Sequence, residues 1–301
     1  MGACNEFDTT QSGAMIYLGF AFLTALFESL KDLSGKFGLG QINEFFISWA
    51  MSAFALPILL PILFYVGIPE LNASFWKAIL VGGLLNAVSL VLYMRAIRMS
   101  DLSVTIPMIT FTPMFLLITS PFMVGEYPST IGVFGVLLIV GGSYMLNIQT
   151  RGKGILEPFK RLLVDPGPRL MLLVAFIWSF TSNIDKIGVQ NSSPIFWSVA
   201  MTSFLAVSLF PIMLKFSDHS KEKIINQAKP LIAIGVFNAL TFVTQMIAIN
   251  FVFVAYVISI KRGSAILSVF WGHLFFNEKG LRERLVGVII MVAGVFLITL
   301  S

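Results

Sequence analysis

Residues 83–97 read GLLNAVSLVLYMRAI, and residues 235–249 read GVFNALTFVTQMIAI. The two stretches lie 152 positions apart and share seven identities in fifteen, among them Gly83 with Gly235 and Asn86 with Asn238. Compositional bias alone rarely produces such a match at one offset. The stretches therefore indicate an internal repeat, and this repeat decides how the rest of the chain is divided.

The same offset continues through the later part of each half. Glu126 matches Glu278, and Gly135, Val136, Val140 and Gly142 match Gly287, Val288, Val292 and Gly294. Toward the start of each half the offset is near 150, where residues 36–38 (KFG) match residues 186–188 (KIG). The chain is thus predicted to consist of two related halves.

The composition is that of a protein that faces lipid. Hydrophobic residues make up 57% of the 301 and charged residues 12%, whereas a soluble domain carries about 25% charged residues. Cys4 is the only cysteine, and His219 and His273 do not have the spacing of a zinc site. We therefore expect no disulfide, metal or cofactor. The net charge of +5 lies in short segments between apolar runs, which favours a role in membrane topology over nucleic-acid binding.

A membrane-spanning helix needs about 20 mainly apolar residues. Ten such segments follow one another along the chain: 14–33, 45–66, 76–98, 102–123, 129–148, 169–188, 194–214, 230–250, 253–275 and 281–300. The uncharged run 230–260 is too long for one straight span, and we expect it to break near Asn250. The sequence predicts an all-α integral membrane protein of about ten transmembrane helices.

The basic residues predict the orientation. One set of loops contains sixteen Lys and Arg residues, whereas the other set, with both termini, contains only Lys77 and Lys186. Because basic loops stay in the cytoplasm, we expect both termini on the extracytoplasmic side of the cell (inner) membrane. The segment 149–168 is interpreted as a cytoplasmic linker between a first repeat at 14–148 and a second at 169–300. Five helices in each half make these inverted-topology repeats, a recurring design of secondary transporters.

The five-plus-five arrangement resembles the drug/metabolite transporter superfamily, in particular its EamA-type members. The resemblance rests on residues 96–103 (AIRMSDLS), which lead into a proline-bearing helix that ends at residues 125–126 (GE). The second half repeats the pattern with Ala248, Tyr256 and residues 277–279 (NEK). The resemblance covers about 14–300, and it implies secondary transport by alternating access, in a family that includes exporters of amino acids and metabolites.

Lys261 and Arg262, in the ninth predicted helix, are the first candidates for solute binding. A Lys-Arg pair at this place resembles that of sugar-phosphate and nucleotide-sugar translocators, in which the pair holds phosphate groups. A charge at the centre of the bilayer costs roughly 2.5–3.5 kcal/mol on insertion scales, and no acidic residue lies within four positions of the pair. An anionic solute would compensate. The alternatives are pairing with Glu28, Asp32 or Asp185, or a position nearer the interface.

A stripe of polar residues is the second candidate. Asn86, Ser89 and Tyr93 are spaced three and four apart, so they share one face of a helix, and their repeat mates are Asn238, Thr241 and Gln245. We expect these six side chains to line a cavity. Hydrogen bonding between helices, typically worth about 0.6–2 kcal/mol per contact, is the alternative, and the two roles can coexist.

The remaining candidates are weighed against structural roles. Glu28 and Asp32 share a face of the first helix with Lys31, so an ion pair at the cytoplasmic end is the simpler interpretation, and proton coupling by Glu28 is the alternative. The same applies to Asp185 at the end of the sixth helix.

Three further features are noted. Pro107 and Pro113 interrupt the fourth predicted helix and are a candidate hinge. Glu126 and Glu278 lie in short loops, where we expect a capping or topology role. We expect His273 to be structural.

The function favoured by these patterns is secondary transport. We expect an exporter or exchanger of an amino acid or of an organic or phosphorylated anion, coupled to a proton or to a counter-substrate. A membrane-embedded enzyme, or a channel or sensor, is the alternative, but the sequence contains no His, Cys and Asp constellation for catalysis and no Walker-type loop for ATP. We expect the lipid bilayer as its environment, a monomer or homodimer, and no nucleic-acid partner.

Overall fold

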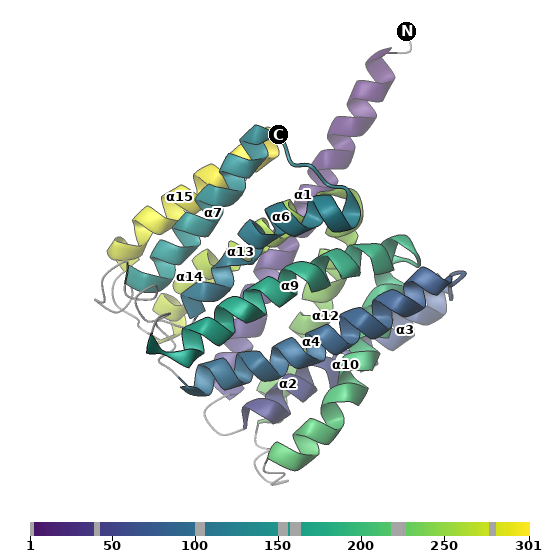
Figure 1. Cartoon of the computed structure of the whole chain (residues 1–301), viewed down its shortest axis with the longest axis vertical. Coiled ribbons are helices and arrows are strands. Elements are labelled where there is room, and N and C mark those ends of the chain that lie inside the picture. Colours follow the sequence, from purple (N-terminus) through teal and green to yellow (C-terminus); the bar gives the residue numbers. More distant parts are fainter. Residues whose placement is uncertain are drawn as a thin grey trace.

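The computed structural model describes residues 3–38, 43–99, 106–149, 156, 164–217, 225, 227–276 and 281–301. Every regular element in these ranges is a helix: α1 (Ala3–Gly38), α2 (Glu44–Ala53), α3 (Leu56–Val66), α4 (Ala73–Met99), η1 (Ile106–Phe111), α6 (Thr112–Val124), α7 (Thr130–Gln149), α9 (Pro166–Gln190), α10 (Pro194–Phe216), α12 (Ala228–Phe251), α13 (Val254–Arg262), α14 (Ser264–Phe276) and α15 (Leu281–Thr299). Figure 1 shows them as one bundle, with both termini toward the same end.

Several helical segments suit a bilayer. Five are long and apolar enough to cross a membrane: Phe45–Val66, Ala73–Tyr93, Pro166–Gln190, Pro194–Phe216 and Ala228–Phe251. Three shorter apolar segments accompany them: Met108–Val124, Thr130–Met145 and Val286–Thr299. Large apolar side chains such as Phe64, Phe122 and Val207 are exposed on the bundle, where water would make them costly. The protein is therefore a membrane-embedded, multi-pass protein.

Three of the predicted spans are interrupted by short breaks. Residues 45–66 form α2 and α3 with a turn at 54–55, and residues 254–276 form α13 and α14 with a turn at Gly263. The fourth span begins, within the described residues, as the 3-10 turn η1 and continues as α6, which ends at Gly125 in the left-handed conformation with φ 68°. The break expected near Asn250 lies at residues 252–253.

Contacts between the helices follow the internal repeat. α1 packs on α12 and α4 packs on α9, and the repeat relates these two pairs; α7 packs on its own repeat mate, α15. At the α7–α15 crossing, a Cβ on Gly135 would lie 2.7 Å from the carbonyl oxygen of Gly294, and a Cβ on Gly142 would lie 2.6 Å from that of Gly287. The two helices are therefore antiparallel, and the two glycine contacts are copies of one another under the offset seen in the sequence.

A second pair of glycine contacts obeys the same relation. Gly83 of α4 lies against the ring of Phe204 in α10, whereas Gly235 of α12 lies against Phe54 in the turn between α2 and α3. The two glycines are repeat mates, and so are the two phenylalanines at the offset of 150. Small residues at such crossings let helices approach closely where no hydrophobic effect drives them together.

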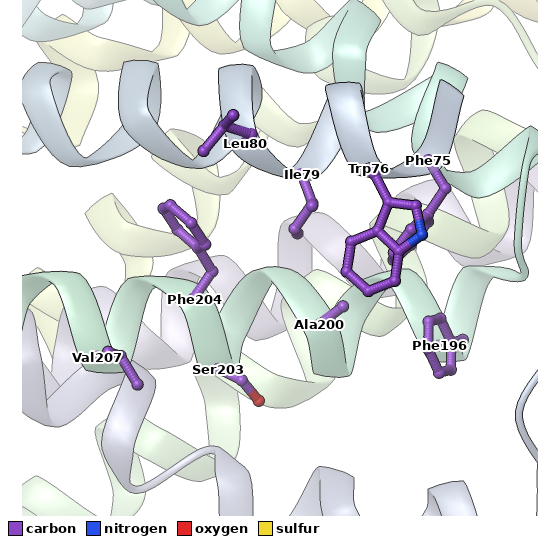
Figure 2. Close-up of a pocket in the computed structure, with 9 residues that line it drawn as sticks. All are labelled: Phe75, Trp76, Ile79, Leu80, Phe196, Ala200, Ser203, Phe204 and Val207. Carbon is purple, nitrogen blue, oxygen red and sulfur yellow. The ribbon is translucent and has the colours of Figure 1, made fainter. Parts of the chain in front are cut away.

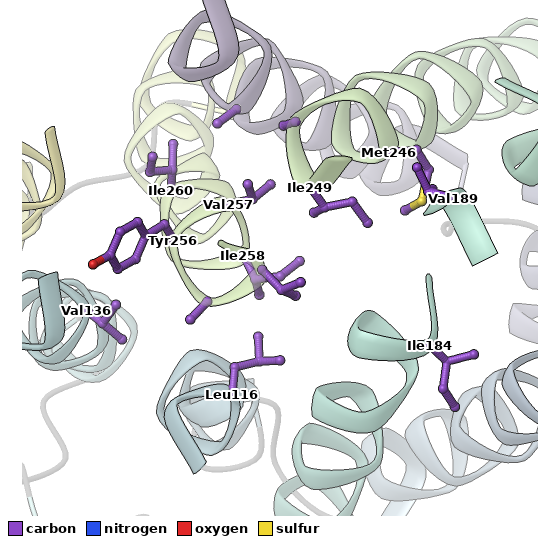
Figure 3. Packing of buried hydrophobic residues seen from close by; sticks show 14 of the residues in the cluster. Leu116, Val136, Ile184, Val189, Met246, Ile249, Tyr256, Val257, Ile258 and Ile260 are labelled. Carbon is purple, nitrogen blue, oxygen red and sulfur yellow. The ribbon is translucent and has the colours of Figure 1, made fainter. Parts of the chain in front are cut away.

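The short helix α13 lies inside the largest apolar cluster (Figure 3). All residues from 254 to 260 are buried, and the figure shows them among Leu116 of α6, Val136 of α7 and Ile249 of α12. Helices of both halves thus surround α13, so its position depends on how the halves fit together.

The α7–α15 crossing gives a test of this packing. Gly135→Ala should lower the free energy of unfolding by about 1–3 kcal/mol, the cost of inserting a methyl group into a closed contact, because the new Cβ meets backbone atoms of Gly294. Gly141→Ala, in the same helix, is the matched control, since a Cβ there meets nothing within 4 Å. The thermal midpoint in detergent measures both variants. Equal midpoints would contradict the close crossing.

Candidate functional site

A cluster of charged side chains joins α1, α12 and α13. The Nζ of Lys261 donates a hydrogen bond to Gln245 Oε1 at 2.8 Å and lies 3.6 Å from Glu28 Oε2. The same Glu28 oxygen accepts from Lys31 Nζ at 2.7 Å. Of the alternatives considered for Lys261, pairing with Glu28 is therefore present. Asp32 lies one turn further along α1 and is exposed.

Arg262 extends the cluster toward α6. Its Nη2 donates to Thr112 Oγ1 at 3.2 Å, and its guanidinium interacts electrostatically with Glu28 and Asp32. Among the residues that the structure describes, its buried Nε meets no hydrogen-bond acceptor. A buried N–H without a partner is costly, so Arg262 retains a donor that an anionic group can satisfy.

The two cations lie at a helix break inside the bundle. Lys261 and Arg262 form the last turn of α13, directly before Gly263, and α14 begins at Ser264. The rest of α13 is apolar and buried.

The predicted first span, 14–33, ends before α1 does. α1 continues to Gly38, so Glu28 lies almost three turns before the end of the helix. The ion pair with Lys31 is present as expected, but it faces the interior and reaches Lys261. The prediction placed the end of α1 too early, because the first apolar run is shorter than the helix.

The part of the polar stripe that lies on α4, with Asn86, Ser89 and Tyr93, is in contact with an aromatic residue of α9. Ser89 accepts a hydrogen bond from Trp178 Nε1 at 2.8 Å and donates to the carbonyl of Asn86 at 2.9 Å. The ring of Tyr93 stacks on that of Trp178, with centroids 5.8 Å apart and an angle of 26°. Tyr93 also lies within electrostatic range of Arg262. This stripe therefore supplies a flat aromatic wall near the charged cluster, and Trp178 is a member that the sequence pattern did not reveal.

The repeat mates on α12, Asn238, Thr241 and Gln245, have different contacts. Asn238 Nδ2 donates to the carbonyl of Met51 in α2 at 3.1 Å, which is a contact between helices. Gln245 holds Lys261, and it therefore belongs to the charged cluster. Thr241 is buried, and its Oγ1 has no hydrogen-bond partner among the described residues.

The other candidates lie at the margin of the cluster or outside the described residues, and Asp185 is close enough to Lys261 for an electrostatic interaction. Asp185 is buried and accepts from Trp197 Nε1 at 2.9 Å. Pro113 lies in the first turn of α6, directly after Thr112, and Pro107 lies in η1. Glu278 lies outside the described residues, as does the side chain of His273 in α14. Within the described part of the chain, no group of three or more His, Cys, Asp or Glu side chains is placed to hold a metal ion.

A second polar network occupies the connections at one end of the bundle. Glu126 forms a buried ion pair with Lys186, and its other oxygen accepts from the backbone N of Val254, at the start of α13, at 2.7 Å. The capping role expected for Glu126 is thereby confirmed. Lys186, expected at the end of the sixth helix, lies about one turn before the end of α9 and is buried.

An apolar groove lies elsewhere, between α4 and α10 (Figure 2). It encloses about 620 Å³ and is lined by Phe75, Trp76, Ile79, Leu80, Phe196, Ala200, Ser203, Phe204 and Val207. Trp76, Leu80 and Val207 are exposed on the outside of the bundle. The groove contains no charged side chain, so it does not suit the chemistry of Lys261 and Arg262.

Comparisons with known proteins agree with the repeat. Two segments of the chain, residues 15–148 and 166–300, match the model of one family, described as the EamA-like transporter family. No curated protein matches the chain. A solved structure described only as "Crystal structure of protein" is similar over 95% of this chain and 97% of its own, with a TM-score of 0.78 and 15% sequence identity. At that identity the likeness shows the fold alone.

Proposed function

The chain belongs to the EamA-like transporter family, and from this premise we propose that it is a secondary transporter for a small solute that carries a carboxylate or phosphate group. The charged cluster at the end of α13 is the observation that supports this solute class. Lys261 and Arg262 lie in the interior of a membrane protein, and Arg262 has a buried N–H without a partner in the described residues. A charge-assisted hydrogen bond to an anion satisfies that group.

The neighbouring side chains suggest how such a solute is oriented. Its anionic group binds Arg262 and Lys261, and a flat apolar part lies against the Tyr93–Trp178 pair. Glu28 is the counter-ion of Lys261. Gln245 and Thr112 hold the two cations in place.

The transport cycle that we propose uses the two repeats. The ten predicted spans form two five-helix repeats of inverted topology, with both termini outside the cell and the linker 149–168 in the cytoplasm. Alternating access then exposes the site at α13 to each side in turn. We propose that the protein exports its solute or exchanges it, and that the movement is coupled to a proton or to a counter-substrate.

The test is flux in proteoliposomes made with the purified protein. A panel of amino acids, dicarboxylates and phosphorylated metabolites is first screened for an increase in thermal stability, since a solute that binds the folded state stabilises it. A solute that raises the midpoint should then show saturable counterflow. Conductance without counterflow would indicate a channel, and the absence of both would contradict the proposal.

The repeat-related amides Gln245 and Asn238 should differ in role, because one contacts the candidate site and the other joins two helices. Gln245→Ala should reduce the counterflow of the folded protein strongly, because Gln245 contacts Lys261, and the loss of a hydrogen bond to a charged group should also lower the thermal midpoint. Asn238→Ala should lower stability by about 0.6–2 kcal/mol, the value of a hydrogen bond between membrane helices, since its amide holds the Met51 carbonyl, but it should leave the counterflow of the folded protein largely unchanged. Midpoint and counterflow are measured on both variants. The same loss of flux in both, without loss of stability, would contradict this division.

A further inference from the structure

The Glu126–Lys186 pair forms hydrogen bonds on both sides of the break between α12 and α13. Glu126 Oε2 accepts from the backbone N of Val254, in the first turn of α13, while its Oε1 pairs with Lys186. Lys186 Nζ also donates to the carbonyl of Val252, the residue that ends α12, at 3.2 Å. The carboxylate thus meets the positive end of one helix and the ammonium the negative end of the other.

The two helices held in this way carry the candidate site. α12 contains Gln245, and α13 ends with Lys261 and Arg262. Glu126 belongs to the α6–α7 connection of the first half, whereas Lys186 and the 252–253 turn belong to the second. The ion pair therefore connects the two halves at one end of the bundle, at the start of the helix that presents the cations.

This end of the molecule is closed. Glu126 is 5% exposed and Lys186 7%, and the adjacent Trp197 is fully buried against Gly188. On the other side of the cluster, Asp32 is exposed. The Glu126 end is thus the more tightly packed of the two.

We propose that Glu126 and Lys186 form a latch that closes this end of the solute path and that must open in each transport cycle. The proposal rests on the proposed function of alternating access. A buried ion pair adds little net stability compared with apolar residues of the same size, but it is costly to leave half-made. Such a pair suits an element with two discrete states. In one state the carboxylate and the ammonium bind each other, and in the other state water solvates both. α13 is released with the latch, which links opening to the position of Lys261 and Arg262.

The test uses a cysteine placed beneath the latch. Ser182 lies four residues before Lys186, so it occupies the same face of α9 one turn deeper, and it is buried. In a Cys4→Ala background, Ser182→Cys is labelled with a membrane-impermeant maleimide, added to each side of proteoliposomes in turn. The double variant Glu126→Gln/Lys186→Met removes the ion pair without leaving a buried charge, and the introduced amide oxygen can still accept from Val254. Its labelling rate, from one side only, should rise about tenfold or more, within the range of coupling between sites in proteins.

The control is Asn72→Ala, which removes polar contacts at the same end: an exposed hydrogen bond to Asn191 and the bond that the Asn72 side chain accepts from Phe75 N at the start of α4. It should leave labelling unchanged. Should the double variant not fold, Glu126→Asp serves instead, since it keeps the charge but withdraws the carboxylate from Val254. A folded variant whose labelling equals that of the intact pair would overturn the latch. Counterflow is measured separately, so a protein that labels as expected but transports no solute contradicts the proposed function and not the latch.

Discussion

Arg262→Ala should weaken the binding of a carboxylate- or phosphate-bearing solute by about 1.5–3 kcal/mol, the range for hydrogen bonds to charged groups. Lys261→Ala should have a smaller effect in the same direction. The difference follows from their partners, because Lys261 is already held by Gln245 and Glu28. Among the described residues Arg262 makes one side-chain hydrogen bond, to Thr112, and its buried Nε is unpaired. Its guanidinium is also the better match for a planar anion.

Binding is measured by calorimetry or thermal shift on the purified variants, with anionic solutes and neutral solutes of matched size. Arg262→Lys keeps the charge and should recover part of the affinity but not the bidentate geometry. Lys215→Ala is the control, since Lys215 lies at the far end of α10 over the ring of Phe216. Anion binding of normal strength in both alanine variants would make the pair structural, and the likeness to phosphate-handling carriers would no longer apply.

Much of the fold could be predicted from the sequence because the repeat is itself a structural constraint. Gly135 and Gly142 match Gly287 and Gly294 at one offset, and in the structure these glycines contact each other crosswise. A repeated glycine at a helix crossing leaves a signal in a single sequence, since no other residue fits. The break at 252–253 was also predictable, because an uncharged run of that length exceeds one span.

Other breaks left no comparable signal. The turn at Gly263 directly follows Lys261 and Arg262 inside a predicted span, and a single glycine is also common in continuous membrane helices. The turn at 54–55 contains no proline or glycine, and its one signal is Pro57 in the first turn of α3, which membrane helices also carry elsewhere. Packing of neighbouring helices decides these positions, as with Phe54 against Gly235. Hydropathy along the chain contains no information about such neighbours.

The residues of the site were easier to find than their partners. The cost of a buried charge identified Lys261 and Arg262, and helical spacing identified Gln245. The link from Lys261 to Glu28 joins positions more than two hundred residues apart, and it required the true length of α1. Thr112 and Trp178 carry no signal of their own, because Thr and Trp occur widely in membrane helices. The sequence therefore predicts which side chains need compensation and not which neighbours provide it.

Glu28→Gln should strengthen the binding of a purely anionic solute while it destabilises the empty protein. In the empty site the Glu28 carboxylate is shared by Lys31 and Lys261, so an incoming anion must compete with it for Lys261. The introduced amide offers a neutral acceptor in the same volume, and the competition disappears. Removing the carboxylate also leaves partly buried cations with less compensation, which should cost less than the roughly 3–5 kcal/mol typical of breaking a fully buried pair.

Both effects appear in one thermal-shift titration. The variant without solute should unfold at a lower temperature than the normal protein, and the shift on adding an anion should be larger, because an anion then supplies the missing charge. Asp32→Asn is the matched control, since Asp32 lies on the same helix face but is exposed, and its removal should change both quantities less.

A zwitterionic solute distinguishes between two roles of Glu28. If Glu28 receives the ammonium group of such a solute directly, Glu28→Gln weakens its binding while that of the anion is strengthened. Weaker binding of both classes would show that Glu28 orients Lys261 for the solute and does not compete with it.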